Sequence, residues 1–121
     1  MDIPLVGQVI ASLEFGFSLA LRTNHDYELR IESTFRLDEP GSDGFRGVPD
    51  ASLSENTAVR RLQGRQVARA HASDDGDLRI EFADRASLVV PFDPDFEAWT
   101  VAAPQGFKAV SVAGGGLTVW D

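Results

Sequence analysis

Hydrophobic and polar residues alternate with a period of two along much of the chain. In residues 27–32 the odd positions are apolar and the even positions are charged, whereas in residues 78–82 the apolar set falls on even positions. Side chains of a strand point alternately to the two faces of a sheet, so this pattern predicts strands with one buried face. Residues 9–15 and 19–22 repeat the alternation, and residues 86–92 are apolar on both faces, which predicts a covered strand.

Turn-forming residues separate these runs. Asp75-Gly76 is a dipeptide favoured by two-residue hairpin turns, so a tight hairpin is predicted there. The segments 5–37 and 62–92 also resemble each other weakly, with apolar residues and glycines at similar spacings. We therefore expect two meander-like half-repeats of three strands each, followed by C-terminal strands within residues 97–120.

One segment has the pattern of a short helix. Ser52-Leu53-Ser54-Glu55 has the form of a capping box, in which the Ser52 hydroxyl accepts from the Glu55 amide and the Glu55 carboxylate reaches back. Apolar residues continue at helical spacing to Leu62, and Gly64 can end the helix in the left-handed conformation. A helix is thus expected near residues 52–62. The preceding residues 38–50 are rich in glycine, proline and carboxylates and predict one long loop.

These elements fit one domain of mainly β (α+β) class covering residues 1–121. The expected architecture is a twisted antiparallel sheet or flattened barrel of about eight or nine strands, on which the helix docks.

Composition excludes several classes of function. The formal net charge is −8 and no cluster of Lys and Arg offsets it, so a nucleic-acid partner is not expected. The chain has no cysteine, which excludes disulfides, thiolate nucleophiles and cysteine-ligated metals, and favours a cytoplasmic location. No apolar run approaches the roughly 18 residues of a membrane span, so no membrane role is expected.

The sequence offers no convincing catalytic constellation. His25 lies in a predicted turn and His71 in a predicted strand, and neither is flanked by a nucleophile motif. The acidic run Asp74-Asp75-Gly76-Asp77 lacks the ligand order of a calcium-binding loop. We therefore predict no catalytic, cofactor-binding or metal-binding residues.

The acidic charge favours a non-enzymatic module that binds a protein, for example an immunity-type or regulatory factor that neutralises a basic effector. The expected binding surface is the loop at residues 38–50, with Phe45 and Arg46 as anchors. Trp99 and Trp120 are first expected in the core, and the alternative is that one of them is an exposed anchor of this surface, since tryptophan is enriched at interface hot spots. Its predicted residues are Asp38, Glu39, Asp43, Phe45, Arg46 and Trp99.

Two alternatives belong to other classes. The first is a small-molecule binder or weak enzyme with a cavity between sheet and helix, having His71, Asp74 or Glu97 at its mouth. The second is a structural homodimer that forms through an exposed strand edge.

Several turn and aromatic motifs resemble a family of short uncharacterised actinobacterial proteins, the domain of unknown function 6188. The motifs of the C-terminal half are Glu97-Ala98-Trp99, Gln105-Gly106-Phe107 and Gly114-Gly115 before Leu117–Trp120, and an early Leu5-Val6-Gly7 and a later Gly64-Arg65-Gln66-Val67 extend the likeness over nearly the whole chain. The resemblance implies no activity, cofactor or catalytic residue.

Overall fold

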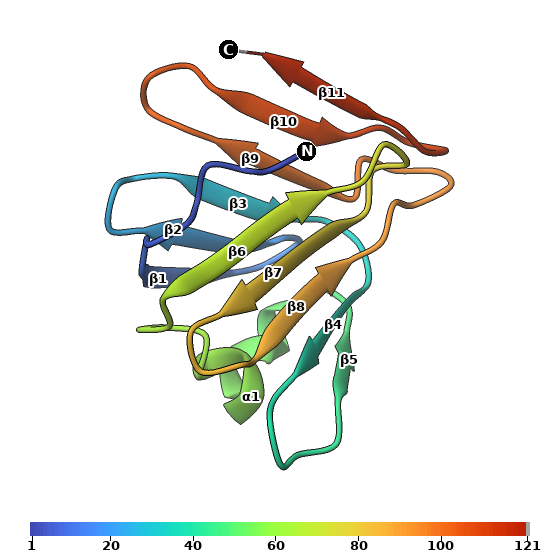
Figure 1. Ribbon diagram of the computed structural model, residues 1–121. Coiled ribbons are helices and arrows are strands. Elements are labelled where there is room, and N and C mark those ends of the chain that lie inside the picture. Colours follow the sequence, from blue (N-terminus) through green and yellow to red (C-terminus); the bar gives the residue numbers. More distant parts are fainter. Residues whose placement is uncertain (121) are drawn as a thin grey trace.

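The computed structural model describes residues 1–120 and consists mainly of β-strands. Eleven strands form two antiparallel sheets, seen as two layers in Figure 1. The six-stranded sheet has the order β1 (Ile10–Phe15), β2 (Leu19–Thr23), β3 (Glu28–Ile31), β9 (Trp99–Ala102), β10 (Lys108–Ser111) and β11 (Leu117–Trp120). The five-stranded sheet has the order β5 (Phe45–Gly47), β4 (Phe35–Asp38), β8 (Ser87–Val90), β7 (Leu78–Phe82) and β6 (Val67–Ala72).

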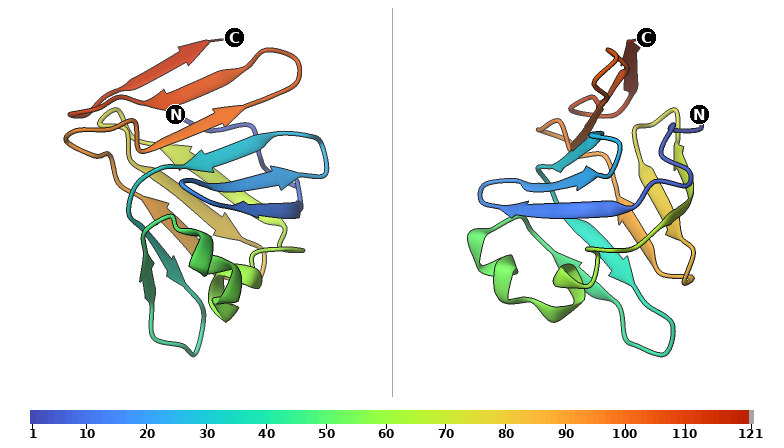
Figure 2. Two further views of the ribbon diagram at one scale, coloured as in Figure 1. Left: turned by 180° about the vertical axis from the view of Figure 1, so that it is seen from behind. Right: turned by 90° about the vertical axis from the view of Figure 1, so that its left-hand side faces the viewer.

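The sheets face each other but do not close, so the expected flattened barrel is wrong. β1 and β11 lie at opposite ends of the six-stranded sheet and do not pair with each other or with the other sheet (Figure 2). Alternation of apolar and polar residues shows that one face of a strand is buried, but it carries no information on which strands pair at the ends. The strand number also exceeds the expected one, partly because residues 38–50 are not one long loop: β5 lies within them and pairs with β4.

The chain exchanges strands between the sheets. β1, β2 and β3 form a meander in the six-stranded sheet, but the next strand, β4, pairs with β8 of the other sheet. The meander of β6, β7 and β8 lies in the five-stranded sheet, and the strand that follows it, β9, pairs with β3. Each meander is therefore extended by a strand from the other half of the chain, which ties the two layers together.

Local details of the two meanders correspond. Both begin with a register shift, between Ile10 and Ser12 in β1 and between Val67 and Arg69 in β6. The turns after β2 and β7 each contain one non-glycine residue with positive φ, Asp26 at 63° and Arg85 at 73°.

The two halves also contact each other reciprocally near the starts of β1 and β6. The Gly7 amide donates to the Val67 carbonyl at 2.8 Å, while the Gly64 amide donates to the Ile10 carbonyl at 2.7 Å. Likewise, the Ile10 amide donates to the Arg65 backbone carbonyl at 2.9 Å, and the Val67 amide donates to the Gln8 backbone carbonyl at 2.8 Å. Each of these hydrogen bonds has a counterpart in which the two halves of the chain are exchanged. The two meanders are therefore related by an approximate two-fold axis.

The apolar positions of the alternating runs fill the space between the sheets. In β7 the residues Leu78, Ile80 and Phe82 are buried, and in β3 Leu29 and Ile31 are buried. Their charged neighbours in sequence point outward, where the Arg22 guanidinium contacts the Glu28 carboxylate at 2.9 Å across β2 and β3. Burial of a large aliphatic side chain stabilises the fold by about 1.5–3 kcal/mol, whereas an exposed ion pair contributes at most about 1 kcal/mol. The apolar interface between the sheets therefore dominates stability.

The predicted helix near 52–62 is two shorter elements, η1 (Ala51–Glu55, a 3-10 helix) and α1 (Thr57–Arg60). The expected capping box does not form: Asp50 caps η1 by accepting from the Ser52 amide. Asn56, between the two elements, is extended and accepts from the Val59 amide at 3.0 Å, so it ends one helix and starts the next. Leu53, Val59 and Leu62 still bury their side chains in the core, as the apolar spacing indicates.

The tip of the β6–β7 hairpin is locked into the core. Gly76 has a φ of +95°, and its carbonyl accepts from the Trp99 indole and from the Ser111 hydroxyl, both at 2.8 Å. The Gly116 amide in turn donates to the Asp75 carbonyl at 2.8 Å. The hairpin turn of one sheet is thus fastened to two strands and a turn of the other.

Gly76→Ala tests this connection. A Cβ at Gly76 would lie 2.5 Å from the Gly116 carbonyl oxygen and would require an unfavourable positive φ. At Gly64, whose φ is +90°, a Cβ meets nothing within 4 Å, so Gly64→Ala isolates the cost of the backbone conformation. We expect Gly64→Ala to lower the free energy of unfolding by about 1 kcal/mol, and Gly76→Ala by about 3 kcal/mol, as measured by urea denaturation. Equal losses of unfolding free energy in the two variants would show that the turn at Gly76 does not fit tightly against the turn between β10 and β11.

Candidate functional site

The residues of the predicted binding loop take part mostly in the β4–β5 hairpin. Asp38 ends β4 and pairs with Arg36 at 3.0 Å, and Phe45 packs against the buried Phe35 with their ring centroids 6.2 Å apart. Asp43 and Arg46 are exposed near the tip of the hairpin. Two of the predicted residues, Asp43 and Arg46, therefore remain available to a partner.

The expectation that Trp99 belongs to this surface is wrong. Its side chain is completely buried at the start of β9, where the indole donates to the Gly76 carbonyl. Polar neighbours in sequence cannot distinguish an exposed tryptophan from one whose N–H finds a buried acceptor. Glu39 is also largely buried, because two arginines enclose its carboxylate.

A charge network joins three segments of the chain around Arg65. The Glu39 carboxylate, which follows β4, contacts Arg65 at 2.6 Å and Arg61 at 2.7 Å. Arg65 also contacts Asp84, in the turn between β7 and β8, at 2.8 Å, and its guanidinium lies 6.0 Å from the centre of the Phe82 ring. Every part of this arrangement fixes one loop against another, so its role is structural.

The arginines lower the pKa of the carboxyl groups in this network. Hydrogen bonds from Arg61 and Arg65 hold the pKa of Glu39 at about 2, against an ordinary value of 4.5. A hydrogen bond from Arg65 likewise lowers the pKa of Asp84. Because the folded state favours the ionised form of Glu39, this group stabilises the fold above pH 4.5, and the stabilisation is lost as the pH falls towards 2.

The strongest feature of the surface is apolar. Phe17, at the tip of the β1–β2 hairpin, is fully exposed, and Phe96 and Val48 expose 64% and 62% of their surface. Exposed large apolar residues that gather together mark interaction sites more often than single ones do. Phe17 had no sequence signal beyond its position in a turn, flanked by Gly16 and Ser18, between two alternating runs.

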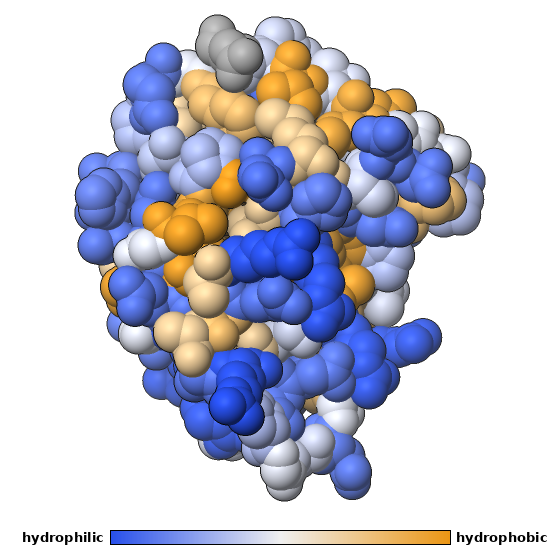
Figure 3. Space-filling model, in the orientation of Figure 1, coloured by the Kyte–Doolittle hydropathy of each residue, from blue (hydrophilic) through white to orange (hydrophobic). Residues whose placement is uncertain are grey.

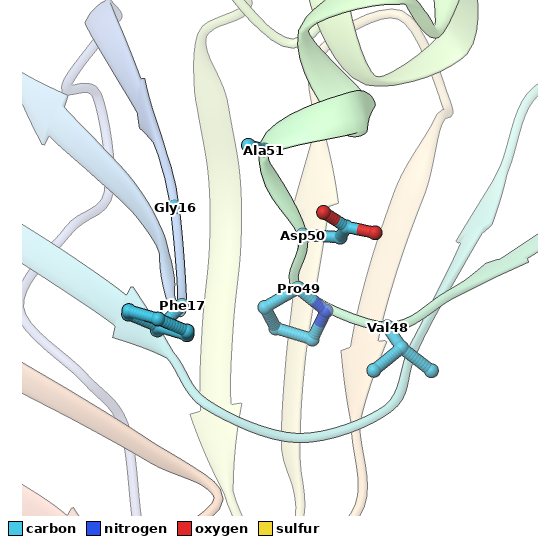
Figure 4. A pocket seen from close by; sticks show the side chains of 6 residues that line it. All are labelled: Gly16, Phe17, Val48, Pro49, Asp50 and Ala51. Carbon is cyan, nitrogen blue, oxygen red and sulfur yellow. The ribbon is translucent and has the colours of Figure 1, made fainter.

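Phe17 lines three hollows. The first, with a volume of about 440 Å³, lies between the β1–β2 hairpin and the segment that joins β5 to η1, where Val48, Pro49 and Asp50 face it (Figure 4). The second, of about 420 Å³, is lined by Phe17 and by Phe96, Arg30, Glu32 and Ser18. We call the surface formed by Phe17, Val48, Pro49 and Phe96 the Phe17 surface.

Carboxylates surround the Phe17 surface. Asp50 and Glu32 line the first two hollows, and Glu14 lies with Phe17 in the third hollow beside them. Among residues 1–120, Arg30 is the one cationic side chain that lines these hollows. It is held by the Glu28 carboxylate at 3.1 Å and by the Ser18 hydroxyl at 2.6 Å. The apolar side chains are therefore set in an acidic rim.

The side chains considered for a catalytic or ligand-binding role do not line one common cavity. The His71 imidazole is 3.4 Å from the Asp2 carboxylate and lines a hollow of about 120 Å³ with Arg69, Arg79 and Glu81. Neither Asp74 nor Glu97, predicted with His71 at one cavity mouth, lines that hollow. Within residues 1–120 no three His, Asp or Glu side chains are grouped so as to hold a metal ion.

Neither helical element in the described part of the chain is long and apolar enough to cross a bilayer.

A family model described as a family of unknown function (DUF6188) matches residues 1–121 of the chain. No curated protein and no solved structure matches the chain.

Glu39→Gln tests the charge network through its pH dependence. Above pH 5 the substitution should lower the free energy of unfolding by about 2 kcal/mol, because it removes the charge that two arginines share. The difference between the wild type and the variant should shrink as the pH falls from 4.5 to about 2, where Glu39 itself is protonated. Urea denaturation at a series of pH values measures it, and a difference that is constant with pH would contradict the assignment.

Proposed function

Because the chain belongs to this family of unknown function, its role must be inferred from its surface, and we propose that it is a non-enzymatic protein-binding module that docks a basic partner on the Phe17 surface. The observation that carries the proposal is the full exposure of Phe17 between two hollows. A cytoplasmic location, favoured by the lack of cysteine, belongs to the same proposal.

The geometry suits an apolar anchor. Binding hot spots combine an aromatic side chain with adjacent pockets that accept apolar groups of the partner. Here the ring of Phe17 stands free, while Val48 and Pro49 on one side and Phe96 on the other offer apolar walls. A partner that covers this surface would remove Phe17, Phe96 and Val48 from water together.

The Phe17 surface rests on ordered strands, which lowers the cost of binding. Phe17 lies in a short loop between paired residues, since Phe15 at the end of β1 faces Leu19 at the start of β2. Little conformational freedom is therefore lost when the ring is immobilised, and more of the contact energy contributes to affinity.

The acidic rim determines the kind of partner. Glu14, Glu32 and Asp50 lie around Phe17, and the whole chain carries a net charge of −8. A partner with an apolar side chain among Lys and Arg residues is complementary to both features. Charge complementarity of this kind mainly raises the association rate and the specificity, and it weakens as salt screens the charges.

The proposed surface overlaps the binding loop expected from the sequence only at its end. Val48, Pro49 and Asp50 close the segment 38–50, whereas Asp43 and Arg46 lie near the hairpin tip and line none of the hollows beside Phe17. The proposal therefore places the anchor on the β1–β2 hairpin and the apolar wall on the residues after β5.

Photocrosslinking in the native cell tests the proposal. A photoreactive phenylalanine analogue replaces Phe17 in one variant and Val6 in a matched control, because Val6 is also exposed but precedes β1, whereas Phe17 follows it. We expect a basic protein to crosslink from position 17 and not from position 6. With that protein purified, Phe17→Ser should weaken binding at least about 10-fold, and raising the salt concentration should weaken it further.

Three results would overturn the proposal. The first is no crosslink at position 17 beyond that at position 6. The second is a captured partner whose affinity is unchanged by Phe17→Ser, and the third is binding that does not depend on salt.

A further inference from the structure

The two sheets have four edge strands, of which β6 and the start of β1 are covered and β5 is short. β6 is covered by the N-terminal segment, whose Ile3 amide donates to the Ala70 carbonyl at 2.9 Å. The start of β1 is covered by the Gly64 amide and by the Gln63 side chain, which donates to the Ala11 carbonyl at 3.0 Å. β5 has three residues. Coverage and shortness are the usual protections of a sheet edge against pairing with another chain.

β11 has neither protection. It pairs with β10 without a register shift, from Ser111 opposite Leu117 to Lys108 opposite Trp120, and nothing in residues 1–120 pairs with its outer side. It also lies outside the approximate two-fold, because β5 and β10 end the corresponding hairpins and β11 is an additional strand after β10. No hydrogen bond from another segment of residues 1–120 covers this edge, whereas the start of β1 is covered.

The outward backbone groups of β11 can be identified from the hairpin. The Val112 amide donates to the Gly116 carbonyl, which makes residues 112 and 116 a hydrogen-bonded pair. Hydrogen-bonded and non-bonded pairs alternate along an antiparallel ladder, so Thr118 and Trp120 direct their backbone groups towards β10. Leu117 and Val119 therefore direct their N–H and C=O groups away from the sheet, on either side of Thr118.

We propose that this edge pairs with β11 of a second copy, antiparallel and with Thr118 opposite Thr118. In this register Leu117 faces Val119 of the other copy, and each such pair exchanges both backbone hydrogen bonds. The two-fold axis passes between the Thr118 residues perpendicular to the sheet, so the two six-stranded sheets form one continuous sheet. Both core faces then lie on the same side, as burial of Leu117 and Val119 requires.

The side chains of β11 fit this register. Trp120 exposes half of its surface, and it would lie opposite Gly116 of the other copy, which leaves room for the indole over the neighbouring strand. On the other face Leu117 and Val119 are only partly buried, and pairing would bring them against the same residues of the second copy. Figure 3 shows apolar side chains gathered over the upper end of the molecule, where β10 and β11 lie.

The dimer is an equilibrium that depends on concentration. A four-residue edge buries less surface than the roughly 1,000 Å² of a stable interface. Each copy carries a charge of −8, so the copies repel each other and salt should strengthen the dimer. This salt dependence is opposite in sign to that expected for a basic partner at Phe17, so the two associations can be distinguished.

A single cysteine tests the register. Directly opposed residues of a non-hydrogen-bonded pair have Cα atoms about 4.5 Å apart, within the range of about 4.4–6.8 Å that a disulfide spans. The chain has no other cysteine, and Thr118 is exposed. Under mild oxidation Thr118→Cys should form a covalent dimer at least about 10-fold faster than Ser12→Cys, a matched control that exposes its cysteine on the other six-stranded edge, β1.

A proline variant and sedimentation complete the test. Val119→Pro removes an outward N–H and leaves the bonds of Thr118 and Trp120 to β10, so in the Thr118→Cys background it should abolish the crosslink. The wild type should sediment faster as protein and salt concentrations rise, and Phe17→Ser should not change this. A crosslink that is equally fast at position 12, absent at position 118 or unaffected by proline would overturn the proposal.

Discussion

The fold is held together by burial of one face of each sheet against the other. Each strand contributes its apolar side to a single interface, and the exchange of β4 and β9 between the sheets prevents either half from separating without breaking pairs in both. Trp99, whose indole is anchored on the Gly76 carbonyl, occupies the interior with the aliphatic side chains. The interior is thus used for folding, and the features available for recognition lie at the rim.

The rim divides into parts with different tasks. The network of Glu39, Arg61, Arg65 and Asp84 uses paired charges to hold the helical segment and two turns against the sheets. Around Phe17, by contrast, carboxylates outnumber the single arginine that lines the hollows, and the apolar ring has no packing role. At the far end of the six-stranded sheet, β11 presents outward backbone N–H and C=O groups instead of charged side chains. The first arrangement stabilises the fold, and at the other two we propose that a basic partner and a second copy bind.

The sequence predicts the strands better than it predicts their arrangement. Alternation over residues 78–82 coincides with β7, and the run 27–32 contains β3, because a period of two is a direct consequence of strand geometry. Whether the sheet ends meet depends on pairings between distant residues, so the barrel could not be distinguished from two open sheets. The helix predicted near 52–62 is interrupted at Asn56, a good capping residue. Its side chain accepts the hydrogen bond from the Val59 amide that a backbone carbonyl would accept in a continuous helix. Trp99 and Phe17 show the same limit for the site, since a tryptophan with polar residues nearby in sequence is buried and a phenylalanine in a turn is exposed.

We propose that Phe17 contributes to recognition and not to the fold, and its contribution to stability can be measured. Urea denaturation of Phe17→Ser should give a free energy of unfolding within about 0.5 kcal/mol of the wild type, because the ring is already in water. Leu21→Ser, at a fully buried position of β2 in the same hairpin, should lose at least about 3 kcal/mol. A loss of more than about 1.5 kcal/mol in Phe17→Ser would show that the ring packs against the protein and is not free for a partner.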